Sequence, residues 1–187
     1  MKSKIITIAG TLGSGKSSAA KRVAAELGYT HFSSGDLFRA MAAERGISVE
    51  EINIKAEAEQ EIDHAVDERL RELSKGSELV FDSRTAFHWM PNSFRVFLNL
   101  DPHVAAERIY IHIQEEGRAS QVGESVEAIY ASTIARRASE LKRYKALYNL
   151  DISDLSPFDL VIDTEKNSLD AVVEAILKNY RAWLERD

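Results

Sequence analysis

A glycine-rich stretch near the N-terminus, GTLGSGKSS, has the composition of a loop that holds phosphate. Gly10, Gly15, Lys16 and Ser17 fit the pattern G-x-x-x-x-G-K-[ST]. Glycines let successive backbone N–H groups turn toward one anion, and a helix beginning near Lys16 would add its positive end. Lys16 can reach the β- and γ-phosphates of a nucleotide, and the Ser17 hydroxyl can face Mg²⁺. We therefore predict an ATP-binding loop made of Gly10, Thr11, Leu12, Gly13, Ser14, Gly15, Lys16, Ser17 and Ser18. The alternative is a glycine turn beside a chance Lys-Ser pair.

A second stretch, FSSGDLFR at residues 32–39, could receive another anion. Its small residues permit close approach of a ligand, and Arg39 lies one helical turn past Gly35, where it can meet a phosphate. The alternative is a helix cap at Ser34 or Asp36 beside a solvated arginine.

An acidic residue, Asp82, ends the apolar stretch SELVFD. At a strand end it could orient Mg²⁺ through water, although a structural carboxylate is the alternative. The five histidines show no helical ligand pair, and we predict none of them as a metal ligand. The only metal we expect is Mg²⁺, brought by ATP.

The class of phosphate-loop protein can be narrowed from motifs. We find no N-K-x-D, which a GTPase needs to recognise guanine, and Asp82 is followed by Ser83 rather than by the second acidic residue of a motor ATPase. Small-molecule kinases remain, and they need a second binding site for the acceptor.

The elements that must position these residues alternate along the chain. We predict strands at 4–10, 29–33, 77–82, 94–101 and 158–163. We predict helices at 16–28, 35–46, 60–76, 103–116, 125–148 and 168–185, one more opening with a capping box at Ser48, and a loop at 117–125. Such alternation indicates an α/β fold with a mainly parallel sheet, and its ligands bind at the carboxyl ends of the strands.

Composition limits the partners. The 187 residues suit one domain and carry a formal net charge of -6, which does not favour nucleic acid or an anionic membrane as a partner. The absence of cysteine fits a reducing cytoplasm, and no apolar run approaches the roughly 20 residues that span a bilayer. We reject a signal peptide and expect a cytoplasmic monomer that binds small-molecule nucleotides.

Several segments together resemble the archaeal-type cytidylate kinases, a branch of the adenylate-kinase-like nucleoside monophosphate kinases. The resemblance covers nearly the whole chain. It is carried by SSGDLFRAMAAERGISVEE (33–51), EIDHAVDERLREL (61–73), SELVFDSRTAFHWM (77–90), AAERI (105–109) and the segment 125–164 with its Y-x-x-D-I-x-D-L motif.

The resemblance implies a function and a set of site residues. The chain would be a single kinase domain, a P-loop three-layer α/β/α sandwich with a five-stranded parallel sheet, a helical acceptor-binding insertion at about 33–75 and a small lid at about 110–125. It would transfer the ATP γ-phosphate to CMP or dCMP. The implied substrate-binding residues are Ser34, Gly35, Asp36, Arg39, Arg84 and Trp89; the implied catalytic residues are Lys16, Arg136, Arg143 and Arg118, with Arg108 as a further cation; Ser17 and Asp82 would serve Mg²⁺.

Arg136 and Arg143 also follow a pattern of their own. They lie seven residues apart and so share one face of a predicted helix. The alternative is that RRASELKR is a solvated charged face with internal ion pairs.

Three departures from the family pattern bear on the acceptor. Ser83 stands where the family has glycine, TAFH at 85–88 places Phe87 and His88 beside the expected base pocket, and the segment around Arg118 is long. Two alternatives therefore stay open. One is a kinase for AMP or UMP, and the other is a regulatory protein that binds ATP without phosphoryl transfer.

Overall fold

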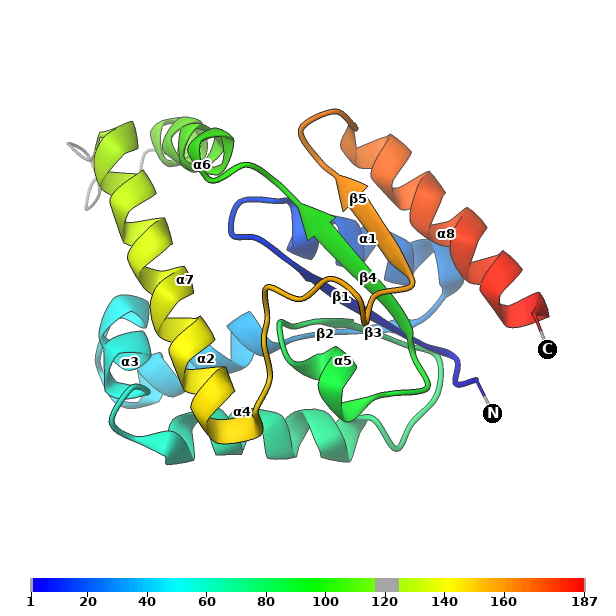
Figure 1. The fold of residues 1–187 in the computed structure, drawn as a ribbon, viewed down its shortest axis with the longest axis horizontal. Coiled ribbons are helices and arrows are strands. Elements are labelled where there is room, and N and C mark those ends of the chain that lie inside the picture. Colours follow the sequence, from blue (N-terminus) through cyan, green and yellow to red (C-terminus); the bar gives the residue numbers. More distant parts are fainter. Residues whose placement is uncertain (1, 117–124, 187) are drawn as a thin grey trace.

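A five-stranded parallel sheet forms the centre of the molecule in the computed structural model, which describes residues 2–116 and 125–186 (Figure 1). The strand order is β2-β3-β1-β4-β5. The strands are β1 (Ile5–Gly10), β2 (Thr30–Ser33), β3 (Leu79–Asp82), β4 (Phe94–Asn99) and β5 (Leu160–Asp163). The helices are α1 (Lys16–Leu27), α2 (Ser34–Glu44), α3 (Val49–Lys55), α4 (Gln60–Leu73), α5 (Ala86–Trp89), α6 (Pro102–Glu116), α7 (Val126–Tyr148) and α8 (Leu169–Glu185). The expected α/β fold and five-stranded parallel sheet are confirmed.

Both faces of the sheet are covered, which makes three layers. Side chains alternate between the faces along β1. Ile6 and Ile8 are fully buried in one cluster with residues of α1 and α8, among them Ile176. Ile5 packs on the other face with Leu70 of α4 and with α5. The near-continuous apolar strands of the sequence reflect this double burial.

Local sequence signals set where most helices begin and end. Ser48 and Glu51 form the predicted capping box at the start of α3, and the Ser168 hydroxyl caps α8. The Asp101 carboxylate accepts hydrogen bonds from the backbone N–H groups of His103 and Val104, so it opens α6 rather than ending β4. The predicted helix limits are therefore close to the observed ones.

The four-residue helix α5 was not predicted. Four residues are too few to show a helical repeat in the pattern of apolar residues. Its buried residues Ala86 and Phe87 lie against the sheet, and the turn carries the chain from β3 toward β4.

Helices α2, α3 and α4 connect β2 to β3 in sequence. In Figure 1 they lie together at the lower left, beside the sheet. Helix α7 runs from the region of α6 down to α4 and so faces this group of helices. Arg143 of α7 joins them through Asp63 of α4, at 2.8 Å from Nε to Oδ2. Residues of the loop after β1, of α2–α4 and of α7 line one cavity, which is described below.

Candidate active site

The loop between β1 and α1 has the form of an anion cradle. A Cβ at Gly10 would lie 2.4 Å from the backbone oxygen of Leu98, so only glycine allows the loop to leave the sheet here. Gly15 has φ 78° at the start of α1, a left-handed conformation that favours glycine. The hydroxyls of Thr11 and Ser14 are buried without a hydrogen-bond partner. Unpartnered donors in a cradle of backbone N–H groups fit a phosphate ligand.

The other loop residues occupy distinct places. Gly13 packs against Ala105 of α6, with 3.1 Å between Ala105 Cβ and an ideal Cβ position. Leu12 lines the cavity described below, and Ser18 is exposed in the first turn of α1.

Ser17 and Asp82 meet at the carboxyl ends of two neighbouring strands. The Ser17 hydroxyl donates a hydrogen bond to Asp82 Oδ2 at 2.5 Å, and Asp82 pairs in register with Ile8 of β1. A hydroxyl and a carboxylate side by side are hard oxygen ligands of the type Mg²⁺ prefers. This donor pair fits the ion that the sequence predicts for these two residues.

A cavity of about 160 Å³ joins the phosphate loop to α2, α4 and α7. Lys16, Ser17 and Asp82 line one side of it. The predicted acceptor residues Ser34, Gly35 and Arg39 line another, together with Arg84 and Arg136. Sequence positions more than 100 residues apart thus converge on one space, as the sequence predicts.

Asp36 lies next to this cavity in the first turn of α2. Its backbone N–H donates to the Ser33 hydroxyl at 3.3 Å, so Ser33 rather than Ser34 is the helix cap. Its carboxylate forms an exposed ion pair with Arg39. The Ser34 hydroxyl is left near the strand end, where it donates to the Asp82 backbone oxygen at 3.4 Å.

Two arginines of the cavity share one buried carboxylate. Arg84 Nε lies 2.8 Å from Glu140 Oε2, and Arg136 Nε lies 3.0 Å from Glu140 Oε1. Burial alone would raise the pKa of Glu140, but the two guanidinium groups outweigh it and lower that pKa. Glu140 therefore fixes both arginines and leaves their remaining N–H groups free to meet an anion.

Lys16 stands in an environment that disfavours its charge. Burial, and secondarily the positive charge of Arg84, lower the pKa of Lys16 to about 8. An anionic ligand would reverse both effects, because it would supply the negative charge that the site lacks.

Arg143 and Trp89 are two predicted residues that do not line this cavity. Arg143 is buried on Asp63 and donates to the backbone oxygen of Asn53 at 3.2 Å. It lines the adjoining groove between α3, α6 and α7 instead. Trp89 packs its ring under Arg71, whose guanidinium carbon lies 3.7 Å from the ring centroid. Arg118, with most of the predicted lid, lies outside the described residues.

Neither Phe87 nor His88 lines this cavity, so their position beside the base pocket stays a prediction. Phe87 is buried against Phe158, with ring centroids 4.6 Å apart, in a separate cluster beneath β4. His88 is exposed and rests on Trp89. The α5 turn directs one ring into the core and the other to the surface, which a linear comparison with a family pattern cannot reveal.

A second, smaller cavity of about 90 Å³ lies on the other side of the phosphate loop. Ser14 and Gly15 line it together with Arg108, Thr164 and Asn167. Arg108 donates to the Thr164 backbone oxygen at 2.9 Å. Thr164 and Asn167 were not predicted from the sequence, although they follow directly after the strand β5, where ligands gather in such folds.

Polar residues of the first cavity were also missed. Asn53, Asp63, Asp67 and Thr85 also line it. Asp63 and Asp67 are one helical turn apart beside the buried face of α4, and this spacing was the available signal.

Fold and cradle together define a phosphate-loop nucleotide-binding protein of the three-layer α/β class. Residues 9–127 match the family described as "AAA domain". The fold resembles that of shikimate kinase from Acinetobacter baumannii in complex with shikimate, with a TM-score of 0.61 at 17% identity, over 98% of this chain and 96% of that one.

Curated relatives identify the family more closely. The chain is 39% identical over 176 residues to the cytidylate kinase of Methanothrix thermoacetophila, which covers 92% of this chain and 97% of that protein. It is also 39% identical over 183 residues to the cytidylate kinase of Natronomonas pharaonis, over 94% of this chain and 90% of that protein. This chain belongs to the cytidylate kinase family.

Proposed function

We propose that this protein transfers the γ-phosphoryl group of ATP to the phosphate of CMP or dCMP, giving the nucleoside diphosphate and ADP. One observation carries the proposal. A single cavity has the phosphate loop on one side and three arginines from three separate segments, Arg39, Arg84 and Arg136, on the others. Such a space suits two polyanions held end to end.

The chemistry of this transfer requires positioned cations rather than a strong base. The acceptor oxygen belongs to a phosphate that is already largely anionic near neutral pH. The barrier comes from bringing two polyanions together and from charge on the moving phosphoryl group. Lys16 would contact the β- and γ-phosphates, Arg39 and Arg84 would bind the acceptor phosphate, and Arg136 would face the group in transit.

The donor nucleotide would extend from the phosphate loop into the 90 Å³ cavity. Arg108, with its planar guanidinium, and Asn167, with its amide, line that space and could contact the base. Ser17 and Asp82 would hold the Mg²⁺ that accompanies ATP, and the ion would neutralise phosphate charge when bound. The hydroxyl and carboxylate found together there fit this role.

We further propose that α2–α4 form the acceptor-binding insertion, at about 33–75, within a single kinase domain over residues 1–187. Arg143 and Arg118 stay predictions, the first because its guanidinium is paired with Asp63 in this structure. We also propose that the protein acts as a monomer and, because it has no cysteine, in a reducing cytoplasm. None of the helices in the described part of the chain is long and apolar enough to cross a membrane.

A steady-state assay of ADP release tests the proposal. Purified protein with ATP and Mg²⁺ is offered CMP, dCMP, UMP, AMP and GMP, with a reaction lacking acceptor as control. We expect CMP or dCMP to give the highest kcat/KM. If AMP or UMP gives the highest kcat/KM, the acceptor named in the proposal is wrong and that nucleotide takes its place. ATP binding without transfer to any acceptor would favour the regulatory alternative.

The Lys16→Met variant provides the matched control for this assay. It keeps an unbranched side chain only one atom shorter and removes the charge, so we expect it to lose transfer to every acceptor. Unchanged transfer would contradict the placement of the phosphates on this loop.

A further inference from the structure

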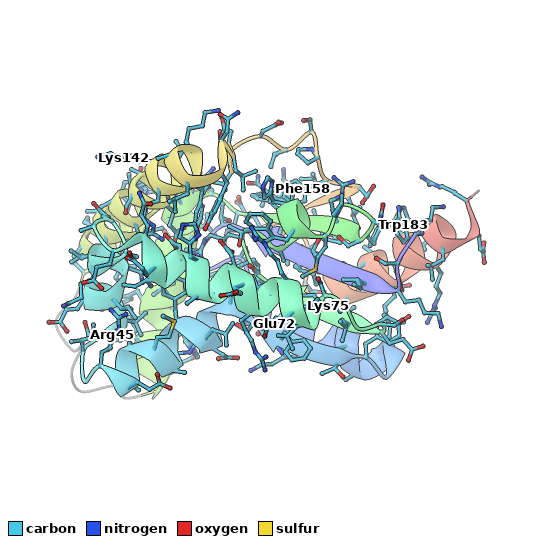
Figure 2. All side chains as sticks on the ribbon, turned by 90° about the horizontal axis from the view of Figure 1, so that it is seen from below. Arg45, Glu72, Lys75, Lys142, Phe158 and Trp183 are labelled. Atoms are coloured by element: carbon cyan, nitrogen blue, oxygen red, sulfur yellow. The ribbon has the colours of Figure 1, made fainter. Side chains whose placement is uncertain are left out.

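One carboxylate oxygen on α4, beside the acceptor cavity, is buried without a hydrogen bond. Asp67 is 4% exposed on α4, and its Oδ1 accepts a hydrogen bond from the Thr85 hydroxyl at 2.9 Å. Its other oxygen, Oδ2, is buried without a hydrogen bond. Figure 2 views the molecule from below, with α4 across the foreground beside α7, on which Lys142 is labelled. A buried carboxylate oxygen left unpaired is costly, so a donor is expected to complete it.

The other buried carboxylate of α4, that of Asp63, does have a charged partner. Asp63 lies one turn earlier on α4 and is held by Arg143, at 2.8 Å from Oδ2 to Nε. Its charge is thus compensated by a cation from α7. At Asp67 the partners are neutral: the Thr85 hydroxyl donates to Oδ1, and the Tyr148 hydroxyl interacts with the carboxylate but makes no hydrogen bond to Oδ2.

Charges of both signs line the cavity. Lys16, Arg39, Arg84 and Arg136 line it together with Asp67, and the charges that act on Lys16 are those of Arg84, Asp82, Glu140 and Arg136 rather than that of Asp67. A monophosphate must lie among the cations, because a carboxylate repels it. The part of the nucleotide that extends away from its phosphate is the base, which therefore meets α4.

We propose that Asp67 Oδ2 accepts a hydrogen bond from the exocyclic amino group of the acceptor base. This inference rests on the proposed function and adds a residue that selects the base. Cytosine presents an amino donor at C4, whereas a 4-keto pyrimidine presents a carbonyl oxygen at that place. Against uracil, two acceptors would face each other and Asp67 would stay unpaired, so Asp67 selects CMP over UMP.

The size of the effect follows from the hydrogen bond. A bond to a charged acceptor is worth about 1.5 to 3 kcal/mol, which corresponds to about 10-fold to 100-fold in relative affinity. A nucleotide whose base lacks the amino group would also leave the Asp67 oxygen without a hydrogen bond, which weakens its binding further.

The first experiment uses the unmodified protein and measures binding, so it does not depend on turnover. Isothermal titration compares CMP, UMP and a CMP analogue with hydrogen in place of the C4 amino group. We expect UMP and the analogue to bind at least about 10-fold more weakly than CMP. Equal binding of all three, or no binding of CMP, would overturn the role of Asp67. Tight CMP binding without phosphoryl transfer would keep this inference and refute the proposed function.

The Asp67→Asn variant tests the residue itself. An amide of the same shape offers both an N–H and an oxygen, so the preference of CMP over UMP, in affinity and in kcat/KM, should fall by about 10-fold or more. The Kd for ATP should not change, which also shows that the variant is folded. An unchanged ratio of CMP to UMP would overturn the proposal.

Two further measurements distinguish contact of Asp67 with the base from an indirect effect through Tyr148 and from contact with the sugar. Burial first, and then its interaction with the Asp67 carboxylate, raise the pKa of the Tyr148 hydroxyl, so this hydroxyl is the donor within the protein that competes for Asp67. Tyr148→Phe should leave the CMP to UMP ratio unchanged; a shift in this variant equal to that of Asp67→Asn would contradict direct contact with the base. If Asp67→Asn changes the ratio of CMP to dCMP but not of CMP to UMP, the carboxylate contacts the sugar, and the proposal fails.

Discussion

In the protein without ligand, the surroundings of Lys16 disfavour its charged form. Burial and Arg84 bring its pKa to about 8, so the free protein loses this charge as the pH rises through that value. Bound phosphates favour the ammonium form and raise the pKa again. Binding ATP at pH 8 should therefore take up about half a proton, and much less at pH 6, where Lys16 is already charged.

Calorimetric titration in buffers of different ionisation enthalpy measures this proton uptake. Lys16→Arg is the control, because arginine stays protonated throughout and should abolish the extra uptake at pH 8. Equal uptake by the two proteins would show that Lys16 does not hold the phosphates.

Glu140 is predicted to act through the arginines that it holds. Glu140→Gln removes the charge that orients Arg84 and Arg136, and we expect kcat to fall by about 10- to 100-fold, as small displacements of catalytic groups commonly cause. The Kd for ATP should change far less, because Glu140 lines the acceptor cavity. Steady-state kinetics of the variant measure kcat, and titration with ATP measures the Kd.

Glu72→Gln is the matched control for this change. Glu72 forms an exposed pair with Arg69 at 3.1 Å on the outer surface of α4, where it is labelled in Figure 2. Exposed pairs contribute about 1 kcal/mol or less. We expect wild-type rates from this variant, and a Glu140→Gln protein as fast as Glu72→Gln would refute the positioning role.

At the scale of elements, α8 stabilises the sheet at a distance from the chemistry. Ile176 is fully buried between α8 and the strands. Ile176→Ala should lower the free energy of unfolding by about 2 to 5 kcal/mol, because methyl groups are lost and a cavity remains. Urea denaturation measures this loss, and kcat of the folded variant should be unchanged. Glu174→Ala on the exposed side of α8 should stay within about 0.5 kcal/mol of wild type.

The connection between α7 and α4 allows a test of Arg143. Arg143→Met leaves the buried Asp63 without its partner, which should cost about 3 to 5 kcal/mol in unfolding free energy. The double variant Arg143→Met with Asp63→Leu should recover most of that loss, since no buried charge is left unpaired. Thermal unfolding of the three proteins decides this. A single variant that is stable but inactive would instead favour the catalytic role predicted from the sequence.

For the whole molecule, the sequence allowed most of the architecture to be predicted because its signals are local. Apolar β-branched runs mark the strands, and capping residues such as Ser48 and Ser168 mark where helices begin. The α5 turn escaped because it is shorter than the repeat that reveals a helix. Strand order and layering depend on tertiary contacts, which the periodicity of apolar residues does not reveal. The three-layer, five-stranded arrangement was therefore expected from the family resemblance.

Which predicted residues line one cavity follows from the sequence where a motif fixes the backbone, and does not follow where packing decides. Lys16, Arg39 and Arg84 follow a strand end or a helix start, so their positions follow from the fold. Trp89 could not be placed, because a residue on a short turn can face either way and packing against Arg71 settles its direction. Asp67 was missed because its spacing from Asp63 indicates a shared helix face but does not show that one of its oxygens is buried without a hydrogen bond.

Direct observation of the product tests the central claim, that the γ-phosphoryl group of ATP moves across this cavity to CMP. Phosphorus NMR of a mixture of protein, ATP, Mg²⁺ and CMP follows each phosphate separately. The account predicts that CDP and ADP appear in equal amounts, with no inorganic phosphate beyond that in a mixture lacking CMP, and that Lys16→Met forms neither. ADP with inorganic phosphate and no CDP, or no change at all in protein that binds both nucleotides, would contradict it.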